Sequence, residues 1–146
     1  FEVRKEIDLV EKTCQLEGIF LVLNSFHIEQ LPKYYSGIHL TSDDLNKYKK
    51  RPISKDKILG ASCHNKREIL MAESIQVDYI FLSPLKETNS HKINKAIGWK
   101  RFRSLVLETN IPVLALGGLQ KEDLSIAQTN GAYGIAGIRN FWPFNV

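Results

Sequence analysis

The chain has 146 residues, of which 43% are hydrophobic and 25% are charged, so it has enough apolar residues to bury one hydrophobic core. Its net charge of +4 is too modest to indicate a nucleic-acid partner, and its longest apolar run, 111–116, is far shorter than the roughly 20 residues of a membrane helix. Two cysteines, Cys14 and Cys63, are too few for a disulfide framework or a metal cage. We therefore expect a single cytoplasmic domain over residues 1–146, with reduced thiols and with neither nucleic acid nor membrane as a partner.

The first predicted element is a helix over residues 2–17, because one apolar stripe runs along it and Gly18 suits a helix C-terminus. Strand-like apolar runs follow at residues 19–23, 37–40 and 58–61. Between the last two, the basic segment 47–57 is predicted to be a solvated surface. A second helix is predicted to begin after Asn65, because Glu68 three residues later resembles a capping box.

The C-terminal half continues the alternation of strands and helices. Strands are predicted at residues 79–82, 113–116 and 134–138, and helices at about 98–110 and through Leu124 and Ala127. Nearly continuous apolar strands separated by helices predict an α/β fold with a parallel sheet. We expect a (β/α)8 TIM-barrel-type fold, present as about six βα units with the N-terminal strands missing, because barrels of eight strands need a longer chain. An open six-stranded sheet with helices on both faces is the alternative.

Ligands of parallel α/β folds bind at the C-terminal ends of strands, so the residues that follow each apolar run are the candidates for a site. These segments are Asn24-Ser25, Thr41–Asp44, Ser62–His64, Ser83-Pro84 with Thr88, Ser90 and His91, Gly117-Gly118, and Gly137, Ile138 and Arg139. The residues chosen from them as site residues are Asn24, Asp44, Ser62, His64, Thr88, Ser90, His91, Gly117, Gly118, Gly137, Ile138 and Arg139. They offer hydroxyls, an amide, imidazoles, a carboxylate, a cation and accessible backbone N–H groups. In a (β/α)8 barrel the glycine turns after the last two strands commonly hold a phosphate, so we expect a phosphorylated small molecule as the ligand.

Several of these candidates have a structural alternative. Ser62 is predicted to donate to a phosphate oxygen and His64 to act as a general acid or base, unless both satisfy the N-terminus of the next helix. Asp44 is a candidate Mg²⁺ ligand, unless Asp43 or Asp44 caps a helix. Arg139 either clamps a phosphate or pairs with a surface carboxylate.

Three further side chains are predicted to be structural. Cys63 lies between Ser62 and His64, and strand alternation points it to the opposite face, which argues against a Cys63–His64 nucleophile pair. His39 lies inside a strand and is expected to be packed and hydrogen-bonded rather than a ligand. Trp99 is expected to pack in the core or at the rim of the barrel.

Taken in order, these segments resemble the thiamine phosphate synthases and the related thiazole tautomerases, which share one (β/α)8 fold. The resemblance covers residues 2–142 and rests on the order and spacing of several short motifs, none of them decisive alone. They are Leu23-Asn24, Gly37–Leu40 with Asp44, Gly60–His64, Asp78-Tyr79 with Ser83-Pro84, Gly98, Pro112–Gly118 and Gly134–Ala136. More narrowly, residues 82–84, 90–91, 98–99 and 137–142 resemble the branch often fused behind a nudix hydrolase domain.

The resemblance implies that hydroxymethylpyrimidine pyrophosphate loses pyrophosphate and that the ring nitrogen of a thiazole phosphate captures the pyrimidine. It also implies Mg²⁺ as cofactor and a fused or associated nudix hydrolase domain as partner, and we further expect a homo-oligomer. By matching position, the pyrophosphate and Mg²⁺ would lie at Asn24 and Asp44, hydroxyl contacts would come from Ser62, Thr88 and Ser90, and the thiazole phosphate would lie on the N–H groups of Gly117, Gly118 and the backbone around Ile138.

The chain departs from the synthase pattern at several positions. Ser25 stands where synthases usually have an aspartate, His91 where they have a lysine, and Arg139 where they have a serine near the phosphate. The strand end that grips the pyrimidine would lie in an absent N-terminal segment, so the chain alone is expected to be inactive. Two alternatives stay open: a thiazole tautomerase, whose histidine His64 matches, and a non-catalytic module that binds a phosphorylated thiamine-related ligand.

Overall fold

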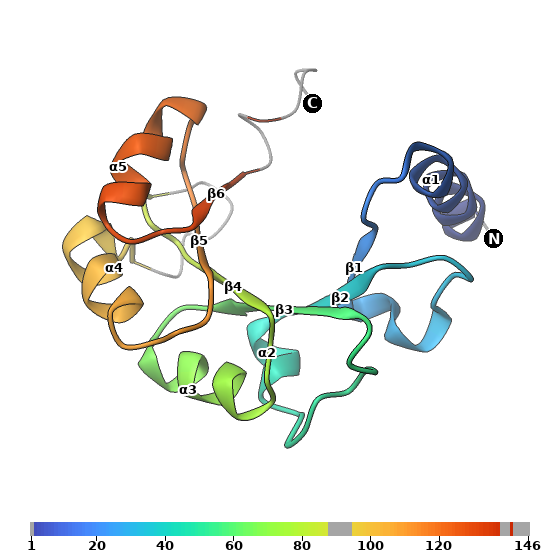
Figure 1. Ribbon diagram of the computed structural model, residues 1–146, viewed down its shortest axis with the longest axis horizontal. Helices are drawn as coiled ribbons and strands as arrows, with labels where there is room; N and C mark the ends of the chain where they lie inside the picture. Colours follow the sequence, from blue (N-terminus) through green and yellow to red (C-terminus); the bar gives the residue numbers. More distant parts are fainter. Residues whose placement is uncertain (1, 88–94, 138–140, 142–146) are drawn as a thin grey trace.

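The computed structural model describes residues 2–87, 95–137 and 141. Its described strands form one parallel sheet of six, paired in chain order from β1 to β6. They are β1 (Val22–Asn24), β2 (Gly37–Leu40), β3 (Ile58–Cys63), β4 (Tyr79–Leu82), β5 (Val113–Leu116) and β6 (Gly134–Ala136). In Figure 1 the sheet curls into part of a barrel wall, and helices α2 to α5 lie along its convex side. The barrel prediction is confirmed, and the open sheet with helices on both faces is wrong.

The helical elements agree with the predicted ones, with three short additions. They are α1 (Glu2–Glu17), η1 (Ser25–Gln30), α2 (Ser42–Leu45), α3 (Lys66–Ser74), α4 (Gly98–Val106), η2 (Lys121–Asp123) and α5 (Leu124–Thr129). The ranges of the 3-10 helices η1 and η2 and of the single-turn α2 were not predicted, because these elements are too short to show a helical period. Helix α4 ends at Val106 rather than near 110, since its last turn tightens into i→i+3 hydrogen bonds from Glu108 to Leu105 and from Thr109 to Val106.

The first strand begins at Val22, later than the predicted residue 19. The reason is the end of α1, where Gly18 has a φ of 64° and Ile19 donates its N–H to the carbonyl of Cys14 at 2.8 Å. This six-to-one hydrogen bond is a Schellman C-cap, which uses Ile19 to end the helix rather than to pair in the sheet. The last strand ends at Ala136, and residue 138 of its predicted range lies outside the described residues.

The main core lies between the sheet and the helices on its convex side. Alternate strand residues point to this side and are fully buried: Ile38, Leu40, Leu59, Ala61, Cys63, Ile80, Leu82 and Ala115 are 0% exposed. Helix α4 adds Phe102, which is also fully buried, and Trp99 packs edge-on against it with ring centroids 5.8 Å apart. The structural role expected of Trp99 is confirmed.

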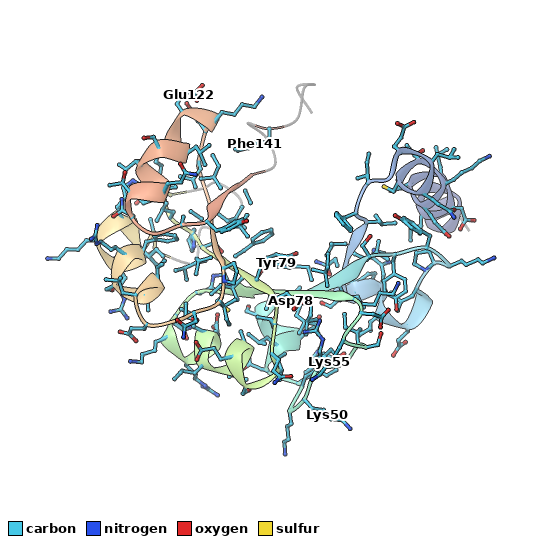
Figure 2. The ribbon with its side chains drawn as sticks, in the orientation of Figure 1. Lys50, Lys55, Asp78, Tyr79, Glu122 and Phe141 are labelled. Carbon is cyan, nitrogen blue, oxygen red and sulfur yellow. The ribbon has the colours of Figure 1, made fainter. Side chains whose placement is uncertain are left out.

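The other strand residues face the concave side, which carries polar and aromatic groups. Figure 2 shows Tyr79 on this side, whereas Lys50 and Lys55 lie on the convex side. The rings of His39, on β2, and of Phe81, two residues further along β4, lie beside Tyr79, with centroids 5.5 and 5.4 Å from its ring. The concave face therefore carries the hydrogen-bonding groups of His39 and Tyr79 beside aromatic rings.

The basic segment on the convex side is partly solvated, as predicted. Lys49 and Lys50 are exposed, but the side chain of Arg51 is only 10% exposed. Its guanidinium donates to Asp78 Oδ2 at 2.7 Å and to the carbonyl of Gln76. Arg51 thus ties this segment to the start of β4 and has a structural role.

Within the described residues, no helix combines the length and the apolar character needed to cross a membrane.

Candidate functional site

The carboxylate of Asp44 is the centre of a polar cluster where β1 and β2 end. Its Oδ2 accepts hydrogen bonds from the hydroxyls of Ser25 at 2.6 Å and Thr41 at 3.1 Å, and its Oδ1 accepts from the Lys47 ammonium at 2.6 Å. The hydrogen bond from Lys47, followed by that from Ser25, holds the pKa of Asp44 below its ordinary value, although partial burial opposes the shift. Asp44 is therefore ionised at neutral pH.

The two sides of this carboxylate differ in rigidity. Ser25 is 4% exposed, and its Oγ also accepts the Thr41 N–H at 3.2 Å, so the Oδ2 side is held by a buried network. The side chain of Lys47 is 68% exposed, so the Oδ1 side is closed only by a solvent-facing lysine. Oδ1 is the oxygen that a cation or a water can reach by displacing a surface side chain.

The cap of α2 is Thr41, which corrects the alternative that an aspartate caps this helix. Thr41 Oγ1 accepts the Asp44 N–H at 3.1 Å, one turn into the helix. Since α2 begins at Ser42, both Asp43 and Asp44 already lie inside its first turn and cannot be its N-cap. The carboxylate of Asp44 is consequently left for the cluster.

Asn24 ends β1, at the same edge of the sheet. Its Oδ1 accepts the Phe26 N–H at 2.9 Å and so caps η1, while the residue as a whole is exposed. The side-chain oxygen is thus used locally, and the exposed amide N–H groups are the part of Asn24 that faces solvent.

His64 follows the end of β3 and is oriented by the end of β4. Its Nδ1 lies 2.8 Å from the carbonyl oxygen of Ser83, which can only accept, so Nδ1 carries the proton and Nε2 of the neutral ring is an acceptor. The hydroxyl of Ser83 lies 3.4 Å from the same Nδ1. This orientation leaves Nε2 as the basic nitrogen, as general-base chemistry requires.

The N-terminus of α3 is satisfied by Asn65 and Glu68, as their spacing predicted. Asn65 Oδ1 accepts the Glu68 N–H at 3.0 Å, and Glu68 Oε2 accepts the His64 N–H at 2.7 Å. The alternative in which the side chains of Ser62 and His64 serve this helix is therefore wrong.

Ser62 lies on the concave face and contacts the imidazole of His39. Its Oγ is 2.9 Å from His39 Nε2, and His39 Nδ1 is 3.0 Å from the Tyr79 hydroxyl. Burial lowers the pKa of His39 to about 4 and raises the pKa of Tyr79 to about 12, so both groups are neutral near pH 7. The packed, hydrogen-bonded role expected of His39 is confirmed.

Cys63 points to the opposite face, as strand alternation predicted. It is 0% exposed within the core, and burial raises the pKa of its thiol to about 12. A thiol protonated at neutral pH and turned away from His64 is not a nucleophile, so the absence of a Cys63–His64 pair is confirmed.

The turn after β5 places Gly117 and Gly118 beside the loop after β4. Their φ angles are 108° and 66°, and a Cβ on Gly117 would lie 2.8 Å from the Pro84 Cα. The carbonyls of Leu116 and Gly117 accept the N–H groups of the β4 loop, from Leu85 at 2.9 Å and from residue 86 at 3.0 Å. Only glycine permits both this conformation and this close approach.

The remaining candidates divide by position. Thr88, Ser90, His91, Ile138 and Arg139 lie outside the described residues. Gly137 is described and exposed, and a Cβ on it would lie 2.4 Å from the Phe141 ring. The structure therefore places Asn24 at the end of β1 and Asp44 just after β2, and it places Ser62 near the end of β3 with His64 directly after that strand.

Sequence analysis included Thr41 among the residues at the strand ends but missed two other residues of these clusters. Lys47 follows Asp44 by three residues, so a local pattern could have indicated it. Tyr79 had no such signal, because its partner His39 lies 40 residues away in the chain.

Comparison with known proteins identifies relatives over nearly the whole chain. The sequence model of a family described as thiamine monophosphate synthase matches residues 2–141. The chain is 33% identical to "Putative thiamine-phosphate synthase 2" of Aquifex aeolicus, over 97% of this chain and 74% of that protein. It is 29% identical to the thiamine-phosphate synthase of Methanosarcina barkeri, over 94% of this chain and 63% of that protein.

A solved structure agrees with the fold. Thiamine phosphate pyrophosphorylase from Pyrococcus furiosus superposes with a TM-score of 0.65 at 22% sequence identity, covering 88% of this chain and 61% of that one. The chain thus spans between 61% and 74% of the length of these relatives.

Proposed function

Because the chain belongs to the thiamine monophosphate synthase family, we propose that its protein joins hydroxymethylpyrimidine pyrophosphate to thiazole phosphate and releases pyrophosphate. The observation that carries the proposal is the ionised Asp44, held at the C-terminal ends of β1 and β2 with one oxygen covered only by an exposed lysine. Barrel enzymes of this type bind their substrates at that end of the strands.

In this proposal, the described residues divide between the leaving group and the acceptor. Lys47 and the Ser62 hydroxyl donate to pyrophosphate oxygens, and the turn at Gly117 and Gly118 holds the thiazole phosphate. These contacts position the acceptor nitrogen and stabilise the negative charge that develops on the leaving group. The other predicted contacts, from Thr88, Ser90, His91, Ile138 and Arg139, stay predictions.

The donor set at Asp44 fits a Mg²⁺ ion that arrives with a pyrophosphate. Asp44 Oδ1 would supply one carboxylate oxygen. In many Mg²⁺–phosphate sites the protein provides only one or two carboxylates, and phosphate and water oxygens complete the coordination. Among the described residues no group of three or more His, Cys, Asp or Glu side chains could hold a metal ion. Mg²⁺ would supply charge stabilisation for the departing pyrophosphate.

The test is an assay of the full-length protein with both substrates and Mg²⁺, in which thiamine phosphate and released pyrophosphate are quantified. We expect product, and we expect EDTA and Asp44→Asn each to abolish it. Asp43→Asn is the matched control, because this neighbouring carboxylate is exposed and lies outside the cluster. Turnover that persists in EDTA and in Asp44→Asn would refute the metal role, and absence of product with bound substrates would refute the synthase proposal.

His64 supports a second candidate, isomerisation of a thiazole phosphate carboxylate. The Ser83 carbonyl fixes Nδ1–H and leaves Nε2 free to move a proton, without any metal. A tautomerase would lose turnover in His64→Ala both with and without EDTA. Full turnover in that variant would exclude this candidate.

A third candidate is a non-catalytic module that binds a phosphorylated thiamine-related ligand. Ser25 and His91 support it, because each removes a side chain typical of synthases. It predicts that the ligand raises the melting temperature of the full-length protein without product formation. Observed turnover would contradict it.

We also propose a fused nudix hydrolase domain, on the resemblance of residues 82–84, 90–91, 98–99 and 137–142 to that branch. The full coding sequence tests this directly. We propose the cytoplasm as the compartment, because Cys14 and Cys63 are both free thiols. Subcellular fractionation and light scattering would test the compartment and the proposed homo-oligomer.

A further inference from the structure

We infer that Tyr79 and His39 are positioning residues that hold the Ser62 hydroxyl as a hydrogen-bond donor toward the phosphate-bearing substrate. The inference rests on the proposed function, because it takes Ser62 as a contact to that substrate. It adds two residues from β4 and β2 that act only through Ser62.

The geometry is a chain of three side chains across three adjacent strands. The Tyr79 hydroxyl lies 3.0 Å from His39 Nδ1, and His39 Nε2 lies 2.9 Å from Ser62 Oγ. The imidazole packs against the Phe81 ring at a centroid distance of 4.5 Å, and a Cβ on Gly60 would lie 2.6 Å from His39 Nδ1. The ring of His39 is therefore confined in a slot that only a glycine at position 60 leaves open.

A neutral imidazole has one N–H and one acceptor nitrogen. The three hydrogen-bonded side chains can therefore donate in either of two directions, which we call the two polarities. In the first, Tyr79 donates to Nδ1, Nε2–H donates to Ser62 Oγ, and the proton of Ser62 is free for a ligand. In the second, Ser62 donates to Nε2, Nδ1–H donates to the Tyr79 oxygen, and the phenol proton must find another acceptor. The low pKa of His39, caused by burial, excludes an imidazolium that donates in both directions near neutral pH.

The relative acidity of the two hydroxyls favours the first polarity. The count of partners does not decide it, because each polarity leaves one end proton, that of Tyr79 or that of Ser62, without an acceptor among the described residues. A phenol is a stronger acid than a serine hydroxyl and is the better donor to an imidazole nitrogen. Burial raises the pKa of Tyr79 to about 12, so its proton stays in place.

The first polarity determines which ligand groups can form a hydrogen bond with Ser62. With its oxygen already accepting from His39, Ser62 presents a proton at the end of β3. A phosphate or pyrophosphate oxygen can accept this proton, whereas a ligand with only donor groups at this position cannot pair with it.

The first experiment reads the tautomer of His39 directly in the full-length protein. Two-dimensional ¹H–¹⁵N correlation spectra of the imidazoles, with His39→Gln used for assignment, separate a protonated from an unprotonated nitrogen. We expect an unprotonated Nδ1 and a protonated Nε2, and a partial or complete reversal in Tyr79→Phe. A wild-type spectrum with protonated Nδ1 would overturn the inference. This readout needs no turnover, so it distinguishes failure of the inference from failure of the proposed function.

The second experiment tests whether the hydrogen bonds from Tyr79 through His39 to Ser62 affect turnover and ligand binding. Tyr79→Phe keeps the ring but loses the hydroxyl, and we expect kcat/KM and the affinity for inorganic pyrophosphate each to fall about tenfold. In a Ser62→Ala background the same substitution should have no further effect, because it acts only through Ser62. Additive losses would overturn the inference.

Tyr34→Phe is the matched control, because it removes a tyrosine hydroxyl that donates to the Ile19 carbonyl at 3.2 Å, away from the chain of three. We expect its kinetics to match the wild type. The melting temperatures of all variants are measured as well. A general loss of stability would make Tyr79→Phe lower the melting temperature equally with and without Ser62→Ala, whereas coupling through Ser62 changes only the kinetics.

Discussion

Restoring an aspartate at position 25 would convert the cluster at Asp44 into a site that requires a divalent cation. Ser25→Asp removes the 2.6 Å hydrogen bond from Ser25 to the carboxylate, and a hydrogen bond to a charged group contributes about 1.5–3 kcal/mol. It also places a second negative charge at this position, which is 4% exposed. Two such charges about 4 Å apart repel by between about 1 kcal/mol in water and about 4 kcal/mol at a protein surface.

Lys47 offsets part of this repulsion, so we expect the free energy of unfolding to fall by about 3 kcal/mol in EDTA. For a domain of this size, each kcal/mol lowers the melting temperature by roughly 2–4 °C, so the expected decrease is about 10 °C. Mg²⁺ bound between the two carboxylates should restore the melting temperature, since a ligand at 100 times its Kd adds about 2.7 kcal/mol to the free energy of unfolding. The assay is thermal unfolding of the full-length protein across a Mg²⁺ titration.

Ser25→Asn is the control, because it has the shape of aspartate without its charge. We expect a small loss of stability that does not change with Mg²⁺. If Ser25→Asp proves as stable as the wild type in EDTA, or gains no more from Mg²⁺ than Ser25→Asn does, then the two side chains do not face one another and the Mg²⁺ position at Asp44 is wrong.

Three further predictions follow from the described geometry. Gly117→Ala should lower the free energy of unfolding by more than about 2 kcal/mol in a denaturant titration, whereas Gly18→Ala, with a φ of 64° and no atom near its Cβ, should cost about 1 kcal/mol; equal losses would contradict the close approach at Gly117. With a thiol reagent at pH 8, Cys14 should react in the native protein and Cys63, whose pKa is about 12, only after unfolding; reaction of both native thiols would refute the burial of Cys63. Since its folded pKa is lowered, Asp44 stabilises the protein above its unfolded pKa of about 3.9 and loses this effect as the pH falls through the folded value, so the stability difference between wild type and Asp44→Asn should vanish in acid; a constant difference would exclude this linkage.

Much of the fold could be predicted from local sequence. The apolar runs located all six described strands, and Gly18 and Asn65 marked a helix end and a helix start. The extent of β1 could not be predicted, because Ile19 is as apolar as a strand residue but completes the cap of α1. Apolar character alone does not distinguish these two uses of one side chain.

The positions of several candidate residues at strand ends could be predicted, but their hydrogen-bond partners could not. Strand ends identified Asp44, Ser62 and His64, since a parallel sheet places its C-terminal ends at one edge. The partners depend on register and side-chain direction across neighbouring strands. Tyr79 reaches His39 past Gly60, and this contact exists only because β2, β3 and β4 pair in the observed register.

The charges at Asp44 also bear on the order in which substrate and metal bind. A pair of aspartates would carry two negative charges and attract a divalent cation before any substrate arrives. Here the serine at position 25 leaves one carboxylate, and Lys47 neutralises it at 2.6 Å, so the cluster has no net charge. Under the proposed function, a pyrophosphate would not be repelled by such a site and would draw the exposed lysine away from Asp44, which would free Oδ1 for a Mg²⁺ ion that arrives with the pyrophosphate. Calorimetric titration of the full-length protein should therefore show weak binding of Mg²⁺ alone and much tighter binding once inorganic pyrophosphate is present. Tight binding of Mg²⁺ to the protein alone would contradict this order.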